Sequence, residues 1–277
     1  MALAGTITAL VTPLKNGTVD VEGLQQNLSY QSESGVDGLL ILGTTGEGAT
    51  LSHAERLSVI RAAASEKTLP LIVNVGDIST EATIQKAVEA EKEGADALLI
   101  IAPYYARPSQ EGLARHFEAI AKKTSLPILL YNHPKRTGVT IEIKTLIRLA
   151  AQKNIIGIKD ASGSIPYAAA IRSSLPDFLL FAGDDLLSLP YQAIGAKGVI
   201  SVLSNLFPQE MATLTEESYH RLIPFMELSQ VETNPVPIKA MMNLAGLPAG
   251  EIRAPLAPLA IENEEKIKQV MGDLCIK

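Results

Sequence analysis

The sequence predicts an α/β protein, a (β/α)₈ barrel followed by a helical C-terminal region. Eight apolar runs rich in β-branched residues recur before residue 206, and amphipathic stretches separate them. Continuously apolar strands are typical of parallel sheets that are covered on both faces. Eight units in about 200 residues match the usual size of such a barrel. A doubly wound open sheet is the alternative, but it rarely holds so many evenly spaced units.

Each apolar run is expected to form one strand of the barrel. The runs are 6–13, 37–44, 69–76, 95–103, 126–134, 155–162, 178–185 and 198–205. Helices are expected between them, for example over 53–67 and 81–94, because apolar residues recur there every three or four positions. Ser52 and Ser109 are predicted helix N-caps, and Gly94 is a predicted helix stop.

The strands end near residue 205, and this predicts the domain organisation. We expect residues 1–206 to form the catalytic barrel and residues 207–277 to form a C-terminal helical region. The second region is interrupted by "NPVPIK" (234–239) and "PLAP" (255–258). No low-complexity linker separates the two regions, so we expect the helices to pack on the barrel.

Composition and charge exclude several functional classes. The chain has 277 residues, 47% of them hydrophobic, and a net charge of −6 without a basic block, which argues against a nucleic-acid partner. The single cysteine, Cys275, excludes an internal disulfide and suits a reducing compartment. The N-terminus lacks a basic signal region, and no apolar run approaches the length of a membrane span. We expect a cytoplasmic protein without membrane association.

Lys159 is the most unusual candidate functional residue. It follows "NIIGI" (154–158), which is typical of a buried strand, and it precedes a turn at "DASG" (160–163). In barrels of this type the reacting groups lie at the C-terminal ends of the strands. Burial disfavours the charged form of a lysine, and a neutral amine can form a Schiff base with a carbonyl carbon. The alternative is a structural lysine paired with Asp160 or Asp184.

Several motifs connect this lysine to a known family. They are "GTTGEGATLSHAER" (43–56), "PYYARPSQEGL" (103–113), "LYNHPKRTG" (130–138), "GIKDASG" (157–163), "FAGDD" (181–185), "GVISV" (198–202) and "NPVPIK". In this order they resemble the dihydrodipicolinate synthases, from about residue 4 to about residue 260. That family belongs to the pyruvate-dependent class I aldolase superfamily, which includes N-acetylneuraminate lyase.

The resemblance implies a reaction in lysine and diaminopimelate biosynthesis. Pyruvate would form a Schiff base with Lys159 and then condense with L-aspartate 4-semialdehyde. The imine itself stabilises the developing carbanion, so the implied chemistry needs no metal and no organic cofactor. The spacing of the histidines agrees, since His53, His116, His133 and His220 form no metal-binding motif.

The resemblance also implies a hydroxyl relay beside Lys159. Tyr131 would be the main acid and base, and Thr44 would link it to Tyr105. In the family the second tyrosine of "PYY" reaches into a neighbouring subunit, so a homo-oligomer, a tetramer or a dimer, is implied. Without the resemblance, Tyr104 and Tyr105 are expected only to close a hydrophobic loop.

Substrate-binding residues follow from the same motifs. Thr45 would bind the carboxylate of pyruvate through its hydroxyl and its backbone N–H. Arg136 would hold the carboxylate of the aldehyde substrate as a bidentate fork. Gly183 and the carbonyl of Ile200 would line the pocket. For Arg136, the alternative is an ordinary surface arginine.

Two other functions remain open at this point. One is a related aldolase or lyase that acts on a 2-keto-3-deoxy sugar acid or N-acetylneuraminate. Such an enzyme would have no reason to place a carboxylate-binding arginine in "KRTG" (135–138). The other is a non-catalytic relative, against which the complete set of Lys159, Tyr131, Thr44 and Tyr105 argues.

The chain departs from the family pattern at three places. Asp160 stands where a glutamate is common, and the C-terminal region is about one helix shorter than in many relatives. Ile78, Ala82 and Arg56 stand where lysine-sensitive relatives carry an amide, a glutamate and often a histidine. We therefore expect feedback inhibition by lysine to be weak or absent.

Overall fold

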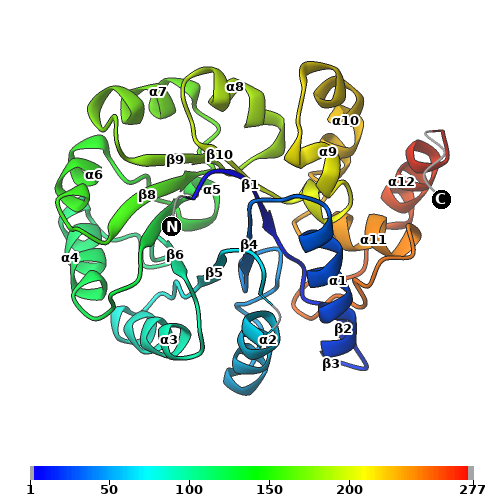
Figure 1. Ribbon diagram of the computed structural model, residues 1–277, viewed down its shortest axis with the longest axis horizontal. Coiled ribbons are helices and arrows are strands. Elements are labelled where there is room, and N and C mark those ends of the chain that lie inside the picture. Colours follow the sequence, from blue (N-terminus) through cyan, green and yellow to red (C-terminus); the bar gives the residue numbers. More distant parts are fainter. Residues whose placement is uncertain (1–2, 66, 274–277) are drawn as a thin grey trace. The chain divides into compact units, whose positions relative to one another are not determined.

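The computed structural model describes residues 3–65 and 67–273, and it confirms the predicted barrel (Figure 1). Eight parallel strands close into a barrel in the order β1-β10-β9-β8-β7-β6-β5-β4. The strands are β1 (Gly5–Ala9), β4 (Gly38–Ile41), β5 (Leu71–Asn74), β6 (Ala97–Ile101), β7 (Ile128–Asn132), β8 (Ile155–Asp160), β9 (Leu179–Ala182) and β10 (Gly198–Ser201). They are shorter than the apolar runs, and the last residues of each run lie in the loops or short helices that follow.

Helices follow the strands along the chain. They are α1 (Val21–Glu33), α2 (His53–Ser65), α3 (Thr80–Lys92), α4 (Gln110–Ala121), α5 (Pro134–Thr137), α6 (Ile143–Ala150), α7 (Ile165–Ser174), η1 (Asp185–Leu187), α8 (Ser188–Ala193), η2 (Leu203–Asn205), α9 (Pro208–Ala212), α10 (Glu216–Leu228), α11 (Val236–Leu244) and α12 (Ile261–Asp273). The structure thus has a helical C-terminal part after β10, as expected.

The chain divides into two compact units. The central unit contains Pro70–Ile200 together with the N-terminal residues up to Gly5. The two-segment unit contains Thr6–Leu69 and the chain from Ser201 onward. The predicted boundary between residues 206 and 207 stays a prediction.

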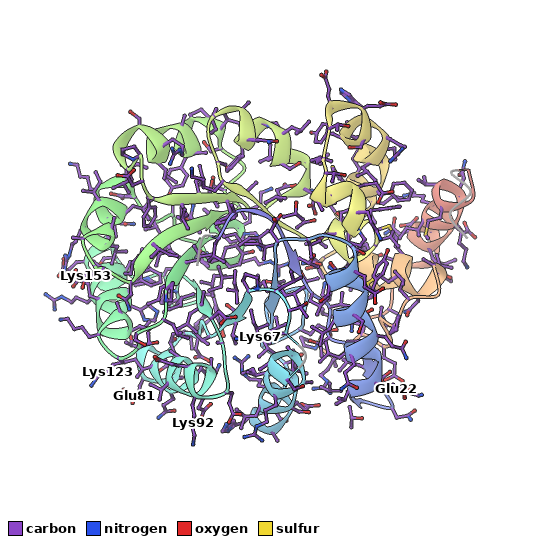
Figure 2. All side chains as sticks on the ribbon, in the orientation of Figure 1. Glu22, Lys67, Glu81, Lys92, Lys123 and Lys153 are labelled. Atoms are coloured by element: carbon purple, nitrogen blue, oxygen red, sulfur yellow. The ribbon has the colours of Figure 1, made fainter. Side chains whose placement is uncertain are left out.

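The central unit shows why these sequences form strands and helices. Strand β6 is buried along almost its whole length, as expected for a strand covered on both faces. On α4, Leu113, Phe117 and Ile120 recur at helical spacing and are all buried. Helices α3, α4, α6 and α7 lie outside strands β5 to β9 (Figure 1). Charged side chains of α3 point outward, as Figure 2 shows for Glu81 and Lys92.

The two-segment unit contains a hairpin that the sequence analysis did not predict. Strands β2 (Leu14–Lys15) and β3 (Thr18–Val19) pair antiparallel across Asn16 and Gly17. Both turn residues have positive φ, at 53° and 73°. Asn-Gly is the dipeptide most typical of such a turn, so the signal was present in the sequence.

The predicted helix ends are confirmed. The Ser109 hydroxyl accepts a hydrogen bond from the N–H of Gly112, and the Ser52 hydroxyl accepts one from the N–H of Glu55. Gly94 lies two residues after α3 with a φ of 97°, a conformation that favours glycine. Within the described ranges, no helix is both long and apolar enough to cross a bilayer. Cys275 lies outside the described residues.

Candidate active site

Lys159 and Tyr131 form the centre of the candidate site, in the central unit. They are register partners near the ends of neighbouring strands β8 and β7. Their side chains are 5% and 6% exposed, and the Lys159 Nζ lies 4.7 Å from the centroid of the Tyr131 ring. The strand-end position predicted for Lys159 is therefore observed, and the structure adds a phenol at its side.

The electrostatic environment favours a neutral amine at Lys159. Burial lowers the pKa of the Lys159 ammonium to about 8. The carboxylate of Asp185 opposes this shift, and the guanidinium of Arg136 adds to it. An amine with such a pKa is partly deprotonated near neutral pH, which is the state needed for attack on a carbonyl carbon.

Asp160 has other partners than Lys159. Its carboxylate accepts hydrogen bonds from Asn132 Nδ2 (2.8 Å), Ser162 Oγ (2.8 Å) and Tyr191 Oη (2.6 Å). Side chains alternate along a strand, so Asp160 points to the face opposite to Lys159, toward α8. Asp184 caps the turn at Leu186, whose N–H lies 3.0 Å from the Asp184 Oδ1. The carboxylate whose charge acts on Lys159 is that of Asp185, a residue the sequence analysis did not assign to the site.

Arg136 lies in the short helix α5, which directly follows β7. Its side chain is exposed, and its charge acts on Lys159 and on His133. The segment after α5 is held in place at Ile141, whose N–H donates to Asn132 Oδ1 at 3.1 Å and whose carbonyl accepts from the Tyr167 hydroxyl. The arginine is therefore carried by an anchored loop that begins next to Tyr131.

His133 is a further group near this centre that the sequence analysis had set aside. Its ring centroid lies 5.7 Å from that of Tyr131, in an edge-on arrangement. Burial lowers the pKa of the His133 imidazole to about 4, and the charges of Arg136 and Lys159 act in the same direction. His133 is therefore neutral at physiological pH. The signal that could have found it is its position one residue after the end of a buried strand.

Gly183 directly follows β9, and Ile200 lies near the end of β10. The N–H of Gly183 donates to the carbonyl of Asp160 at 2.8 Å, and a Cβ on Gly183 would lie 2.9 Å from the Ala161 Cβ. Strands β8 and β9 therefore approach each other closely at this point. Ile200 lies in β10 and is 1% exposed.

Tyr104 and Tyr105 differ sharply in their environment. Tyr105 is 89% exposed and has a φ of 66°, whereas the Tyr104 side chain is half-buried. A non-glycine residue at positive φ is uncommon and requires its surroundings to hold it. This chain buries almost none of the Tyr105 ring, so its predicted relay role stays a prediction.

Thr44 and Thr45 belong to the two-segment unit, in the turn that follows β4. Thr44 is half-buried, and Thr45 is 2% exposed. Leu42 and Glu47 flank them with φ values of 59° and 49°, and each such residue costs about 1–3 kcal/mol. A Cβ on Gly48 would lie 2.0 Å from the carbonyl oxygen of Leu42, so the turn closes tightly on itself.

Contacts from distant residues hold this turn in its strained form. Thr12 Oγ1 donates to the carbonyl of Gly46 at 2.8 Å, and Asn234 Nδ2 donates to Thr45 Oγ1 at 2.9 Å. The carboxylate of Glu47 pairs with the ammonium of Lys239 at 2.5 Å. Two residues of the "NPVPIK" motif, Asn234 and Lys239, therefore have partners in this turn.

One hollow of the central unit lies away from Lys159, and the described residues contain no candidate metal site. In residues 3–65 and 67–273, no three His, Cys, Asp or Glu side chains are placed to hold a metal ion. A hollow of about 350 Å³ is lined by Ile155, Ser174 and Phe178 among others. Ile155 is the first residue of β8 and Lys159 the fifth, so the hollow lies at the opposite end of that strand.

Comparisons with known proteins agree with this geometry. Residues 2–273 match the dihydrodipicolinate synthetase family. A 4-hydroxy-tetrahydrodipicolinate synthase from Archaeoglobus fulgidus is 42% identical over 98% of both chains.

Solved structures of such enzymes have the same fold. The 4-hydroxy-tetrahydrodipicolinate synthase from Methylacidiphilum fumariolicum is 43% identical, with a TM-score of 0.96 over 98% of this chain and 95% of that one. The dihydrodipicolinate synthase from Aquifex aeolicus is 34% identical, with a TM-score of 0.97 over 99% of both chains. With its closed barrel and its buried lysine at the end of β8, the chain belongs to the dihydrodipicolinate synthetase family.

Proposed function

We propose that this chain is a lyase that condenses pyruvate with L-aspartate 4-semialdehyde through a Schiff base on Lys159. The observation that carries the proposal is the buried Lys159 ammonium, with a pKa lowered to about 8, lying 4.7 Å from the ring of Tyr131. A desolvated amine beside a phenol supplies both a nucleophile and a group that can exchange protons. The relatives are named as synthases of 4-hydroxy-tetrahydrodipicolinate, and the family resemblance supports a place for the reaction in lysine and diaminopimelate biosynthesis.

The chemistry proceeds in steps that balance. The neutral amine of Lys159 attacks the ketone carbon of pyruvate, and the resulting carbinolamine loses water to give a protonated imine. A proton leaves the methyl carbon, and the electrons of that C–H bond flow into the imine to form an enamine. The enamine carbon then attacks the aldehyde carbon and forms the new C–C bond. Finally the amino group of the condensed substrate attacks the imine carbon, the ring closes, and the amine of Lys159 leaves.

Tyr131 is the group proposed to move protons in these steps. Its hydroxyl is assigned to the loss of water and to the proton transfers at the imine, and Thr44 and Tyr105 are assigned to a relay behind it. The family resemblance supports the last two assignments, and a Thr44→Val variant should slow turnover if they are correct. The 89% exposure of Tyr105 fits a side chain that completes the site of a second subunit, so we propose a homo-oligomer, a dimer or a tetramer.

Four residues are assigned to substrate binding. Thr45 binds the carboxylate of pyruvate through its hydroxyl and backbone N–H, and Gly183 and the carbonyl of Ile200 line the pocket. Arg136 binds the carboxylate of the aldehyde substrate as a bidentate fork. The imine acts as the electron sink, so this route requires no metal and no organic cofactor. We place the reaction in the cytoplasm, where amino-acid precursors of this kind are made.

Trapping of the imine tests the proposal. The protein is incubated with pyruvate, reduced with borohydride, digested and mapped by mass spectrometry. We expect the adduct on Lys159, no adduct in Lys159→Arg, and an unchanged adduct in Lys197→Arg, which alters an exposed lysine of the same unit. An adduct on Lys197 or Lys239, or no adduct, contradicts the proposal. Turnover with aspartate semialdehyde beside a panel of 2-keto-3-deoxy acids and N-acetylneuraminate then identifies the substrate.

A further inference from the structure

Residues from the C-terminal segment 234–253 reach the turn that contains Thr44 and Thr45. Three hydrogen bonds make this connection. Asn234 Nδ2 donates to Thr45 Oγ1 at 2.9 Å, Lys239 Nζ donates to Glu47 Oε1 at 2.5 Å, and the N–H of Arg253 donates to Glu47 Oε2 at 3.0 Å. All of these residues belong to the two-segment unit. The two sides of these contacts lie 189, 192 and 206 residues apart, so the connection is a product of the fold and not of local sequence.

The ion pair in this connection is fully buried. The side chains of Lys239 and Glu47 are 1% and 2% exposed. Lys239 Nζ also donates to the carbonyl of Glu251 at 2.8 Å, so both charged groups have several partners. Desolvation makes a buried pair a weak source of stability, and the best attested use of such a pair is to select one conformation. The conformation selected here includes the left-handed backbone at Glu47.

The hydrogen bond from Asn234 has a consequence for the chemistry of Thr45. A hydroxyl carries one proton and two acceptor lone pairs. Because Thr45 Oγ1 accepts from the Asn234 amide, its own proton is directed elsewhere. A threonine held in this way is prepared as a donor, which is the role that binding of a carboxylate requires.

We propose that Asn234 and Lys239 are positioning residues for pyruvate binding. Asn234 orients the Thr45 hydroxyl as a donor to the substrate carboxylate, and Lys239 holds the backbone of the turn through Glu47. The segment 234–253 is thereby a working part of the site that acts through Thr45 and Glu47. This inference rests on the proposed function, which assigns the pyruvate carboxylate to Thr45.

A double-mutant cycle between Asn234 and Thr45 tests the inference. Imine formation, followed by borohydride trapping, is measured against pyruvate concentration in Asn234→Ala, Thr45→Val and the double variant. We expect Asn234→Ala to raise the half-saturating pyruvate concentration roughly 2- to 10-fold, the factor of one ordinary hydrogen bond, and to leave the KM for the aldehyde unchanged. In the Thr45→Val background the same substitution should add no further effect.

Asn263→Ala is the matched control. Asn263 also donates its amide to a C-terminal side chain, at 2.8 Å from Glu232 Oε1, but that contact lies outside the turn. The control should leave pyruvate binding unchanged. An unchanged pyruvate dependence in Asn234→Ala, or effects that simply add in the double variant, overturns the role of Asn234. If the unaltered protein forms no adduct with pyruvate, the proposed function itself fails, and the two failures are thus distinct.

The ion pair is tested by removing both charges together. Glu47→Gln with Lys239→Met leaves no unpaired buried charge, whereas either single change leaves one. We expect a folded protein, judged by circular dichroism, whose half-saturating pyruvate concentration is raised while its KM for the aldehyde is kept. A folded double variant with normal pyruvate dependence overturns the role of Lys239. Should the double variant fail to fold, Lys239→Arg with an altered pyruvate dependence supports the role, and an unaltered one overturns it.

Discussion

Asn132 donates an amide hydrogen to Asp160 across the ends of two neighbouring strands, with 2.8 Å between Nδ2 and Oδ1. The two residues are register partners, and they directly follow the partners Tyr131 and Lys159. Side chains alternate along a strand, so this polar pair lies on the face opposite to the lysine and the phenol. The hydrogen bond therefore holds the two strand ends in the register that places Lys159 beside Tyr131.

Asp160→Asn is expected to loosen this arrangement. The carboxylate accepts from Asn132, from the N–H and hydroxyl of Ser162, and from Tyr191, and hydrogen bonds to a charged group contribute about 1.5–3 kcal/mol each. We expect a melting temperature lowered by several degrees and a lower kcat. Asp177→Asn, at an exposed aspartate, is the control for the substitution. Wild-type stability and turnover in Asp160→Asn would contradict this role.

The rate of imine formation should depend on pH through Lys159. Its pKa is lowered to about 8, so the neutral amine increases as pH rises through 8 and the rate should level off above it. Asp185 raises this pKa, so Asp185→Asn should move the midpoint to lower pH. The measurement is the pH profile of borohydride-trapped adduct at short times, with pyruvate saturating. A midpoint near 10.5 in the unaltered protein would show that burial does not act on the amine.

Tyr131→Phe should separate imine formation from the later proton transfers. The phenyl ring preserves the packing beside Lys159, and only the hydroxyl is lost. We expect turnover to fall by about 10²–10⁴, the usual range for an acid–base group, with the trapped adduct still formed on Lys159. Tyr30→Phe removes a hydroxyl that donates to the carbonyl of Leu206 and should leave turnover unchanged. Near-normal turnover in Tyr131→Phe would show that a group other than the Tyr131 hydroxyl transfers the proton.

Arg136→Ala should weaken the binding of the second substrate, aspartate semialdehyde, and leave that of pyruvate unchanged. Losing a charge-assisted hydrogen bond to a carboxylate costs about 1.5–3 kcal/mol of binding free energy. This corresponds to a rise of roughly 10- to 100-fold in the KM for aspartate semialdehyde. Imine formation with pyruvate should persist. The neighbouring exposed residue provides the control Lys135→Ala. Equal values of KM and kcat in Arg136→Ala and Lys135→Ala would show that Arg136 is an ordinary surface arginine.

Lysine should inhibit weakly or not at all. Asp77 and Glu81 are the acids next to Ile78 and Ala82 in the sequence, and Asp77 is already paired with Lys86 at 2.5 Å. A cationic ligand would therefore meet a carboxylate whose charge is compensated. Titration of turnover with lysine measures this, and half-inhibition below millimolar lysine would contradict it. Ala82→Glu combined with Arg56→His should increase sensitivity, because the pair adds an acid and removes a fixed positive charge.

The strands and the strand-end lysine could be predicted, because local sequence patterns encode both. Apolar runs revealed the strands, and the position of Lys159 near the end of one of them identified the candidate nucleophile, because the reacting groups of such barrels lie at the C-terminal ends of strands. The contact between Asn234 and Thr45 could not be predicted, since 189 residues separate them and only the fold brings them together. The same holds for Asp160, which borders the lysine in sequence but faces the other side of its strand. The Asn16-Gly17 hairpin is different, because its turn signal was local and was missed.

The two segments of the unit that contains Glu47 are made at different times. Residues 70–200 are contiguous and can complete their contacts in one stretch of synthesis, whereas Glu47 and Lys239 are 192 residues apart. At about 5–20 residues per second, a ribosome needs roughly 10–40 s to cover that distance. Throughout this interval the strained turn has neither its ammonium partner nor Asn234. The central unit can therefore complete its contacts first, whereas the turn assigned to pyruvate binding obtains the N–H of Arg253 only when that residue has been translated.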